Sequence, residues 1–427
     1  MKNLSHKEQF EKAFHLLEIS RKAPFYAEKY KNVPRVTSYE EWCNVPMLTR
    51  DELYKNTYPA STDMFTGPLE DGIISSTGGS SGIARTVALT NEEWDAFCDK
   101  QAEALALLGI KRGDLFANLF VAGHLWPSFL GGHEIAKRIG AVHLPISANI
   151  AFDEIYRLCR QYNPTVMISL PTLFVFLADL AKKDGYTFPN LRVIAYAGEQ
   201  LSKEAEKHIR KYLGVKEVKA LAYSSADCGL MGYQCSDCGF GTYHVPTDFQ
   251  LIEIVDPDTL QPVSSGQTGE VVVTNLCREL QPIIRYRIGD MATFLSEPCS
   301  CDDLNSTFCL AGRAGEDFKL GGAYISMDVF DREIANYDEI SINYRLILED
   351  IGNQMNICIE VESDDKKRAE SIIPFLKKSL EKTIPELRVG QESGYIKDFS
   401  IRILPLSGIE RSPITGKIKK MVDKRVL

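Results

Sequence analysis

Residues 165–198 read TVMISLPTLFVFLADLAKKDGYTFPNLRVIAYAG, and this stretch decides the fold class. The runs 165–170 and 192–198 are short and apolar, which is typical of buried strands. Residues 171–185 between them have the length and apolar content of a helix. A strand, a helix and a second strand in this order predict α/β layers with a mainly parallel sheet.

The same alternation continues on both sides of this stretch. Further strands are expected at 114–120 and 140–147, and further helices at 91–109 and 202–214. From about residue 248 to 295 the pattern changes to strands separated by Gly, Pro and Ser turns. This change predicts a β-rich subdomain after the parallel layers.

The composition changes again at residues 312–324, GRAGEDFKLGGAY. These residues are rich in glycine and in charged side chains, which suits a hinge between domains. Beyond this segment lies a compact α+β pattern. We therefore predict a large N-terminal domain of layered α/β sheets plus a β-rich subdomain, residues 1–315. A small mobile α+β domain, residues 316–427, is expected to follow it.

The composition is that of an ordinary globular protein: 427 residues, 44% hydrophobic and 25% charged. A net charge of −9 argues against a general nucleic-acid binder, which would usually carry a basic field. No apolar run approaches 18 residues, and the charged start, MKNLSHKEQFEKAF, has no signal-peptide core. We expect a cytoplasmic protein without a membrane span.

The stretch SSTGGSSG, residues 75–82, is too poor in apolar side chains to pack a core. It is either a linker or a loop whose backbone N–H groups and hydroxyls surround an anion. It is not the GxxxxGK[ST] phosphate loop, because no lysine follows its last glycine. Taken alone, the stretch leaves both readings open.

Five further segments follow it in a definite order: YAGEQLS at 196–202, AYSSADCGL at 222–230, RYRIGD at 285–290, GRAGEDFKLGG at 312–322 and SPITGKIKK at 412–420. In this order the chain resembles the adenylate-forming superfamily of acyl-CoA synthetases, peptide-synthetase adenylation domains and luciferases. Within it, the chain is most similar to the phenylacetate–CoA ligase branch. The resemblance runs from about residue 70 to 420.

The resemblance implies a nucleotide site. Seven residues would close over the β- and γ-phosphates of ATP: Ser76, Thr77, Gly78, Gly79, Ser80, Ser81 and Gly82. Three residues would line the adenine: Ala197, Gly198 and Glu199. The Tyr223 ring would stack on the adenine, with Ser224 and Ser225 along its edge. Asp290 would accept both ribose hydroxyls, and Arg313 would contact ribose and phosphate.

Two residues are implied as catalytic, Lys417 and Asp227. Lys417 would reach the α-phosphate of ATP, and Asp227 would help to hold Mg²⁺ where the family usually has a glutamate. Asp227 and Ile288, which replaces the usual threonine, depart from the family pattern. Hard oxygen ligation still suits Mg²⁺.

The resemblance implies a two-step reaction with a carboxylic acid, ATP and coenzyme A. The acid would be activated as an acyl-adenylate with loss of pyrophosphate and then passed to the coenzyme A thiol, after rotation of the small domain. The acid is expected to be aryl or arylacetic, such as phenylacetate. Transfer to a carrier-protein thiol and a non-catalytic nucleotide- or zinc-binding regulator remain alternatives. A homodimer is a further expectation.

The residues that would line the pocket for the acid are harder to identify from the sequence. The segment AGHLWPSFLGG, residues 122–132, supplies His124, Trp126 and Phe129, whose rings would suit an aromatic acid. The same side chains could equally form the core of a helix.

Four of the 11 cysteines form two pairs, Cys235 with Cys238 and Cys299 with Cys301. Four thiolates are enough for a tetrahedral structural Zn²⁺ that would tie two loops together at the edge of the nucleotide site. His244 could replace one of them. Unmetallated cysteines and a redox role are the alternatives, whereas disulfides are not expected in a reducing cytosol.

Overall fold

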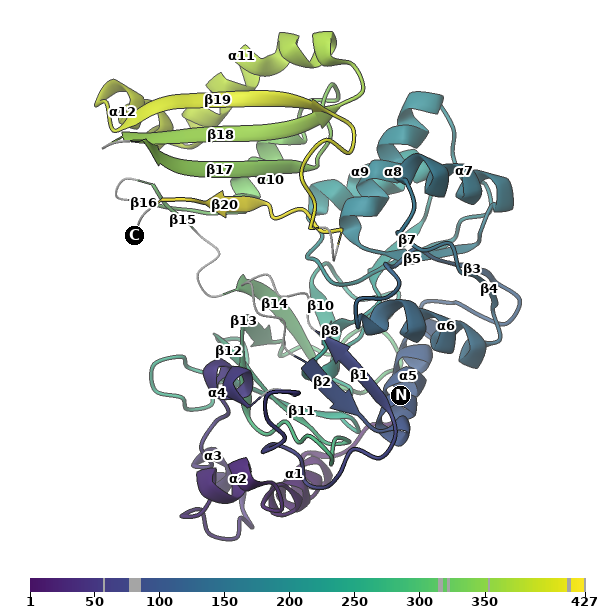
Figure 1. The fold of residues 1–427 in the computed structure, drawn as a ribbon, viewed down its shortest axis with the longest axis vertical. Helices are drawn as coiled ribbons and strands as arrows, with labels where there is room; N and C mark the ends of the chain where they lie inside the picture. The colour runs from purple at the N-terminus through teal and green to yellow at the C-terminus, as the bar shows by residue number, and fades with distance from the viewer. Residues whose placement is uncertain are drawn as a thin grey trace.

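The computed structural model describes residues 1–427 except 57, 77–85, 314–317, 321–322, 352–353, 413–415 and 426–427. Figure 1 shows three regions: a layered α/β region, a β-rich region with the N-terminal helices beside it, and a C-terminal sheet with its own helices. None of the helices in these described ranges is both long and apolar enough to cross a membrane.

The parallel sheet predicted from residues 165–198 is present, with the strand order β4-β3-β5-β6-β7. Its strands are β3 (Leu115–Asn118), β4 (Val142–Leu144), β5 (Val166–Ser169), β6 (Val193–Tyr196) and β7 (Glu217–Ala220). The helices around it are α5 (Asn91–Ala106), α6 (Pro127–Ile139), α7 (Phe152–Tyr162), α8 (Pro171–Asp184) and α9 (Lys203–Leu213). The prediction of α/β layers with a mainly parallel sheet is confirmed.

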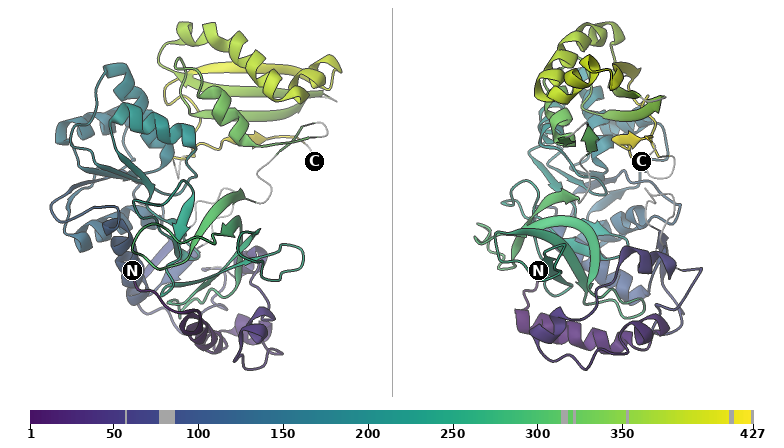
Figure 2. Two further views of the ribbon diagram at one scale, coloured as in Figure 1. Left: turned by 180° about the vertical axis from the view of Figure 1, so that it is seen from behind. Right: turned by 90° about the vertical axis from the view of Figure 1, so that its left-hand side faces the viewer.

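Alternate residues of β5 and β6 enter two different cores, which is why the sequences of these two strands are largely apolar. Met167 and Ile194 pack in the core that contains side chains of α7, α8 and α9. Ile168 and Ala195, one residue further along each strand, pack in the core that contains side chains of α5 and α6. Helices accordingly cover both faces of the sheet (Figures 1 and 2).

The β-rich region is an antiparallel sheet with the order β10-β14-β13-β12-β11. Its strands are β10 (Thr242–His244), β11 (Gln250–Val255), β12 (Thr268–Asn275), β13 (Tyr286–Phe294) and β14 (Thr307–Arg313). Two hairpins lie nearby, β1 (Ile73–Ser76) with β2 (Thr86–Leu89) and β8 (Tyr223–Ser225) with β9 (Gly229–Gly232). Four short helices precede them: α1 (His6–Ser20), α2 (Pro24–Lys29), α3 (Tyr39–Cys43) and α4 (Arg50–Lys55).

Arg285, the first residue of the RYRIGD segment, joins the N-terminal helices to this antiparallel sheet. Its side chain is 1% exposed and pairs with the Glu253 carboxylate through Nε at 3.2 Å and Nη2 at 3.0 Å. Its Nη1 donates to the backbone oxygens of Trp42, Cys43 and Val45 at 2.7–3.1 Å. Part of this segment therefore serves the fold and not the nucleotide.

We expect Arg285→Leu to lower the free energy of unfolding by about 3–5 kcal/mol, because it leaves the Glu253 carboxylate buried without its cation. Urea unfolding followed by circular dichroism measures this loss. Arg157→Leu is the matched control, because Arg157 pairs with Glu154 on the exposed face of α7 and should cost less than about 1 kcal/mol. Equal losses in the two variants would contradict the structural role of Arg285.

The C-terminal region has a four-stranded sheet with the order β19-β18-β17-β20. Its elements are β15 (Phe318–Leu320), β16 (Ala323–Ile325), α10 (Met327–Ile334), β17 (Tyr344–Ile351), β18 (Gln354–Ser363), α11 (Lys366–Thr383), α12 (Pro385–Glu392), β19 (Ile396–Pro405) and β20 (Met421–Asp423). They enclose a separate core whose buried members run from Phe318 to Ile403. The exact division at 315/316 falls on residues outside the described ranges and stays a prediction.

The C-terminal region rests on α8 and α9 of the large region through polar contacts. The buried Asp179 carboxylate accepts a hydrogen bond from the Ser341 hydroxyl at 2.6 Å and pairs with His208 Nε2 at 2.7 Å. Asn343 Nδ2 donates to the Thr172 carbonyl at 3.3 Å. These contacts hold the two regions together beside the functional site.

Candidate active site

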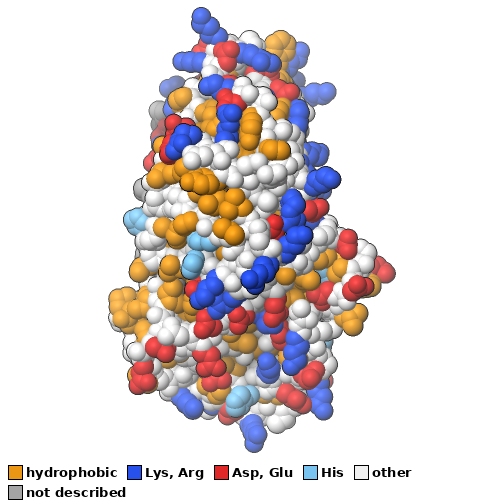
Figure 3. Space-filling model, turned by 90° about the vertical axis from the view of Figure 1, so that its right-hand side faces the viewer, with side chains coloured by type: hydrophobic (Ala, Val, Ile, Leu, Met, Phe, Trp, Pro, Cys, Tyr) orange, Lys and Arg blue, Asp and Glu red, His pale blue; other side chains and the backbone are white. Residues whose placement is uncertain are grey.

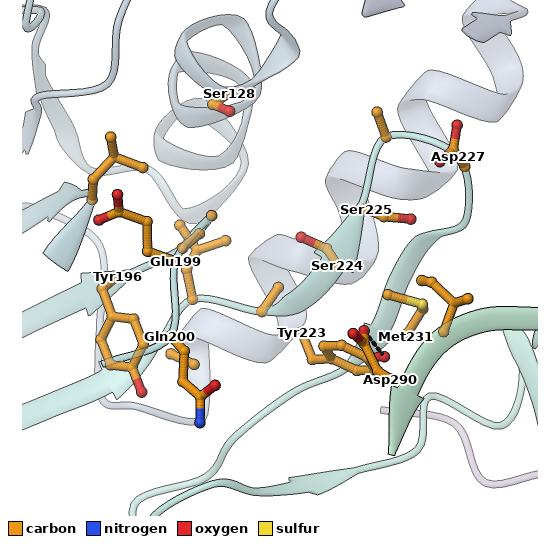
Figure 4. Close-up of a pocket in the computed structure, with 18 of the residues that line it drawn as sticks. Ser128, Tyr196, Glu199, Gln200, Tyr223, Ser224, Ser225, Asp227, Met231 and Asp290 are labelled. Carbon is orange, nitrogen blue, oxygen red and sulfur yellow. Dashed lines mark hydrogen bonds between the residues drawn. The ribbon is translucent and has the colours of Figure 1, made fainter. Parts of the chain in front are cut away.

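One cavity of about 1330 Å³ collects most of the predicted site residues that the structure describes. Its walls come from α5, α6, the segment after β6, the hairpin β8–β9 and strands β13 and β14. The C-terminal region closes it with residues 410–412 and 417–419. Figure 4 shows how the segment after β6, the β8–β9 hairpin and β13 face one another across this space.

The segment predicted to line the adenine, Ala197 to Glu199, follows β6 and lines the cavity. The Glu199 carboxylate accepts hydrogen bonds from the backbone N–H of Thr172 at 3.2 Å and from the Thr172 hydroxyl. Desolvation in this part of the cavity raises the pKa of Glu199 above its ordinary value, although Thr172 and Lys417 oppose the rise. Gly198 has a φ of 83°, which only glycine adopts readily.

Tyr223, Ser224 and Ser225 form strand β8 and also line the cavity. The Tyr223 hydroxyl donates a hydrogen bond of 2.7 Å to Asp290 Oδ2, which is drawn as a dashed line in Figure 4. Asp290 lies on β13, and its Cα is in register with that of Arg313 on β14. The expected adenine and ribose residues therefore meet at one place, although 67 residues separate Tyr223 from Asp290.

Asp227 lies in the turn between β8 and β9, is 1% exposed and lines the cavity. Its backbone oxygen accepts a hydrogen bond from Arg278, which sequence reasoning did not single out. The Arg278 guanidinium also donates to Ala88 O and Gln281 Oε1, both at 3.2 Å. Burial lowers the pKa of Arg278 below its ordinary value. In the sequence, Arg278 is marked only as a charged residue in the short segment before RYRIGD.

The structure describes only the first two residues of the stretch SSTGGSSG, residues 75–82. Ser75 and Ser76, at the end of β1, are buried and line the cavity. Thr77, Gly78, Gly79, Ser80, Ser81 and Gly82 lie outside the described residues. The phosphate role of this segment stays a prediction.

Lys417 belongs to the C-terminal region but reaches the segment after β6. Its ammonium group donates to the Gly198 carbonyl and lies 5.9 Å from the centre of the Trp126 ring. The cation is therefore placed beside the residues expected to hold the nucleotide. This contact joins residues that are 219 positions apart.

Three of the paired cysteines come together with His244, the alternative ligand. Cys235, His244, Cys299 and Cys301 place one ligand atom each within 4.8 Å of one another. The Cys235 and Cys299 sulfurs are 3.6 Å apart, and Cys301 Sγ is 3.5 Å from His244 Nε2. Cys238 lies beside Cys235, with sulfurs 3.5 Å apart, but does not belong to this group of four.

Comparison with known proteins agrees with this arrangement. A family model described as AMP-binding enzyme matches residues 135–277. The phenylacetate-coenzyme A ligase of Thermus thermophilus is 24% identical over 405 residues, covering 90% of this chain and 88% of the relative. The ligase of the same name from Pseudomonas putida is 24% identical over 412 residues, covering 94% and 89%.

Among solved structures, 2-hydroxyisobutyryl-CoA ligase in its postadenylation state superposes with a TM-score of 0.80. The identity is 18%, covering 98% of this chain and 89% of that one. The same ligase in its thioesterification state gives a TM-score of 0.67. The arrangement of the two regions here is therefore closer to the former.

Fold and site together define an adenylate-forming enzyme: an α/β core, a small C-terminal region and a shared cavity lined by the ordered segments. More narrowly, the similarity to phenylacetate-coenzyme A ligases, at 24–25% identity over 74–94% of this chain, supports the phenylacetate–CoA ligase branch of the superfamily.

Proposed function

We propose that this protein is an ATP-dependent acid–CoA ligase that activates an aryl or arylacetic acid as its acyl-adenylate. The observation that carries the proposal is the convergence of Glu199, Tyr223, Asp290 and Lys417 on one cavity. These residues come from separate segments and two regions of the fold. Such side chains are suited to bind an adenine, a ribose and an α-phosphate.

In the first step a carboxylate oxygen of the acid attacks the α-phosphorus of ATP. The bond between that phosphorus and the bridging oxygen breaks, and pyrophosphate leaves. Carboxylate and triphosphate repel each other, so the site must supply positive charge and hold the groups in line. Lys417 supplies one such charge at the Gly198 carbonyl, beside the expected nucleotide.

Asp227 would hold the Mg²⁺ that accompanies ATP. Its carboxylate is a hard oxygen donor, is buried and lines the cavity, which fits the preference of this ion. When bound, the ion would neutralise part of the triphosphate charge. Arg278 fixes the Asp227 backbone and so keeps the carboxylate on the cavity wall.

In the second step the sulfur of coenzyme A attacks the acyl carbon, and AMP leaves. The acceptor could equally be a thiol on a carrier protein, because both need only access to the same acyl-adenylate. Names of the relatives in this branch favour coenzyme A as the acceptor.

The experiment that tests the function measures AMP and pyrophosphate from ATP with aryl, arylacetic and fatty acids. Coenzyme A is then added, and the thioester is identified by mass spectrometry. Release of AMP and pyrophosphate that depends on an aromatic acid supports the proposal. Nucleotide binding with no turnover for any acid would favour the non-catalytic regulator instead.

A structural Zn²⁺ fits the cluster of Cys235, His244, Cys299 and Cys301. Tetrahedral zinc with bonds of about 2.3 Å holds its ligand atoms about 3.8 Å apart, close to the separations of 3.5 and 3.6 Å found here. His244 Nδ1 lies 3.1 Å from the Asn305 carbonyl, which leaves Nε2 directed at the sulfurs. Metal would thus connect the loop after β9 to the loop before β14.

We expect purified protein to carry about one zinc per chain, and Cys299→Ser to reduce this below about 0.2 and to lower Tm by about 5–10 °C. Inductively coupled plasma mass spectrometry and calorimetry give the two values. Cys358→Ser is the control, since Cys358 lies on β18 in the other core region. His244→Ala and Cys238→Ser together decide the fourth ligand, because only the true ligand loses metal when replaced.

A homodimer and a cytoplasmic location remain predictions. Figure 3 shows hydrophobic side chains gathered on one face of the molecule. Five large hydrophobic side chains are exposed on or near α6, β4 and α7: Leu125, Leu130, Val142, Ile150 and Tyr162. Sedimentation analysis at several protein concentrations tests the dimer.

A further inference from the structure

We propose that Gln101 recognises a ring hydroxyl of the acid, so that this enzyme's own substrate is a ring-hydroxylated aryl or arylacetic acid. The inference rests on the proposed function, because it concerns the acid that the ligase activates. It begins from a polar side chain that the first reaction step leaves unused.

Gln101 lies on α5, is 5% exposed and lines the active-site cavity. No hydrogen bond of its carboxamide to another described residue is present, although buried amides nearly always have partners. The amide nitrogen and oxygen are not among the fully enclosed side-chain atoms that lack a partner, so they remain open to the cavity. A donor and an acceptor are therefore available inside the cavity for a polar group of a ligand.

The walls beside Gln101 are suited to a flat ring. Trp94 and Phe97 lie on the same face of α5, with ring centres 5.7 Å apart. Two glycines approach these rings so closely that a side chain at either position would narrow this part of the cavity. A Cβ on Gly131 would lie 3.6 Å from Trp94, and a Cβ on Gly229 would lie 3.5 Å from Phe97 and 3.2 Å from Phe249.

The order of contacts places Gln101 away from the reacting end. Lys417 lies near Trp126, immediately before α6. Further along α6, Gly131 meets Trp94. Further still, Arg138 pairs with Asp99 at 2.5 Å. Arg138 also pairs with Asp95 at 2.5 Å, so α5 and α6 lie side by side and run in the same direction. Gln101 is about 10 Å further along α5 than Trp94, at 1.5 Å per residue.

An acid whose carboxylate points to Lys417 would place its ring between Trp94, Phe97 and Phe249, and its far edge toward Gln101. A hydroxyl on that edge can donate to the amide oxygen or accept from the amide nitrogen. An unsubstituted ring would leave the amide unpaired. Sites built to bind a hydroxyl reject analogues that lack it more strongly than apolar pockets reject an added group.

The test compares phenylacetate with its 2-, 3- and 4-hydroxy derivatives by kcat/KM in thioester formation. We expect the wild-type enzyme to prefer at least one hydroxylated acid by about tenfold or more. Gln101→Leu should lower kcat/KM for that acid by about 10–100-fold and leave phenylacetate unchanged or improved. Gln101→Met also removes the amide but keeps an unbranched side chain like that of glutamine. The same result in both variants would show that a packing defect of the leucine does not cause the loss.

A second readout does not need turnover. Because the amide forms no hydrogen bond with another described residue, Gln101→Met should leave the Tm of the ligand-free enzyme within about 2 °C of the wild-type value. Acid binding without ATP can be followed by quenching of Trp94 and Trp126 fluorescence. Should no acid support AMP release, the proposed function fails, while the binding preference for a hydroxylated acid still tests Gln101. Equal use of all four acids by the wild type, or an equal loss for all of them in Gln101→Leu, would overturn the inference.

Discussion

Replacing Lys417 by alanine should lower the rate of acyl-adenylate formation by about 10²–10³-fold, because the side chain supplies positive charge where the α-phosphate is expected. Transfer of the acyl group from a supplied acyl-adenylate to coenzyme A should be largely spared. The reason is that Lys417 sits on the C-terminal region, which the family rotates away before the second step. Acid-dependent exchange of pyrophosphate into ATP reports the first step alone, and thioester formation from synthetic acyl-adenylate reports the second.

Lys424→Ala is the matched control for the Lys417 variant. Lys424 follows β20 in the same region and forms an exposed pair with Glu349 at 3.5 Å. Its loss removes the same charge from the same region and should change either half-reaction by less than about twofold. If Lys417→Ala slowed both steps to the same extent, its assignment to the first step would be wrong.

Asp290→Ala should raise the KM for ATP by about 100-fold or more. The carboxylate is expected to accept two ribose hydroxyls, and hydrogen bonds to a charged group contribute about 1.5–3 kcal/mol each. The KM for the acid should change little, because Asp290 lies on the β13 side of the cavity, away from α5 and α6. Steady-state kinetics with each substrate varied in turn separate the two effects.

Two further variants sharpen this experiment. Tyr223→Phe removes only the hydroxyl that donates to Asp290 at 2.7 Å, and should cost less than about tenfold in the KM for ATP. Asp290→Asn keeps the size of the side chain but removes its charge, and should fall between Tyr223→Phe and Asp290→Ala. An Asp290→Ala enzyme with an unchanged KM for ATP would remove the ribose role from this residue.

Much of the fold was accessible from the sequence because apolar runs and their lengths are local signals. Strand β5, helix α8 and strand β6 occupy the stretch that predicted them. Ends were less accurate: the strand expected to reach residue 120 ends at Asn118, where the Asn118 amide bonds to the Phe129 carbonyl at 2.9 Å. That partner lies on another element, which no local pattern identifies.

The candidate site was accessible to the extent that its residues stand in ordered segments. Gly198, Asp290 and Lys417 could each be named from the resemblance, whereas the contact between Lys417 and Gly198 follows only from the folded chain. His244 was an alternative ligand, and only the packing of β10 against β14 places it among the cysteines. Gln101 carries no motif at all. Its significance depends on burial, which one sequence does not reveal.

The contact between Asp179 of α8 and Ser341 of the C-terminal region has a consequence for turnover. Asp179 is bound on one side by Ser341 and on the other by His208, and His208 belongs to the large region. If the small region rotated away, as the resemblance implies, the carboxylate would keep its histidine and lose a single hydroxyl. At Asp179 itself the separation would therefore cost about the net value of one hydrogen bond, roughly 1 kcal/mol, and not the several kcal/mol of an abandoned interior anion. Asp179 would therefore oppose only weakly the rotation of the small region that the resemblance implies.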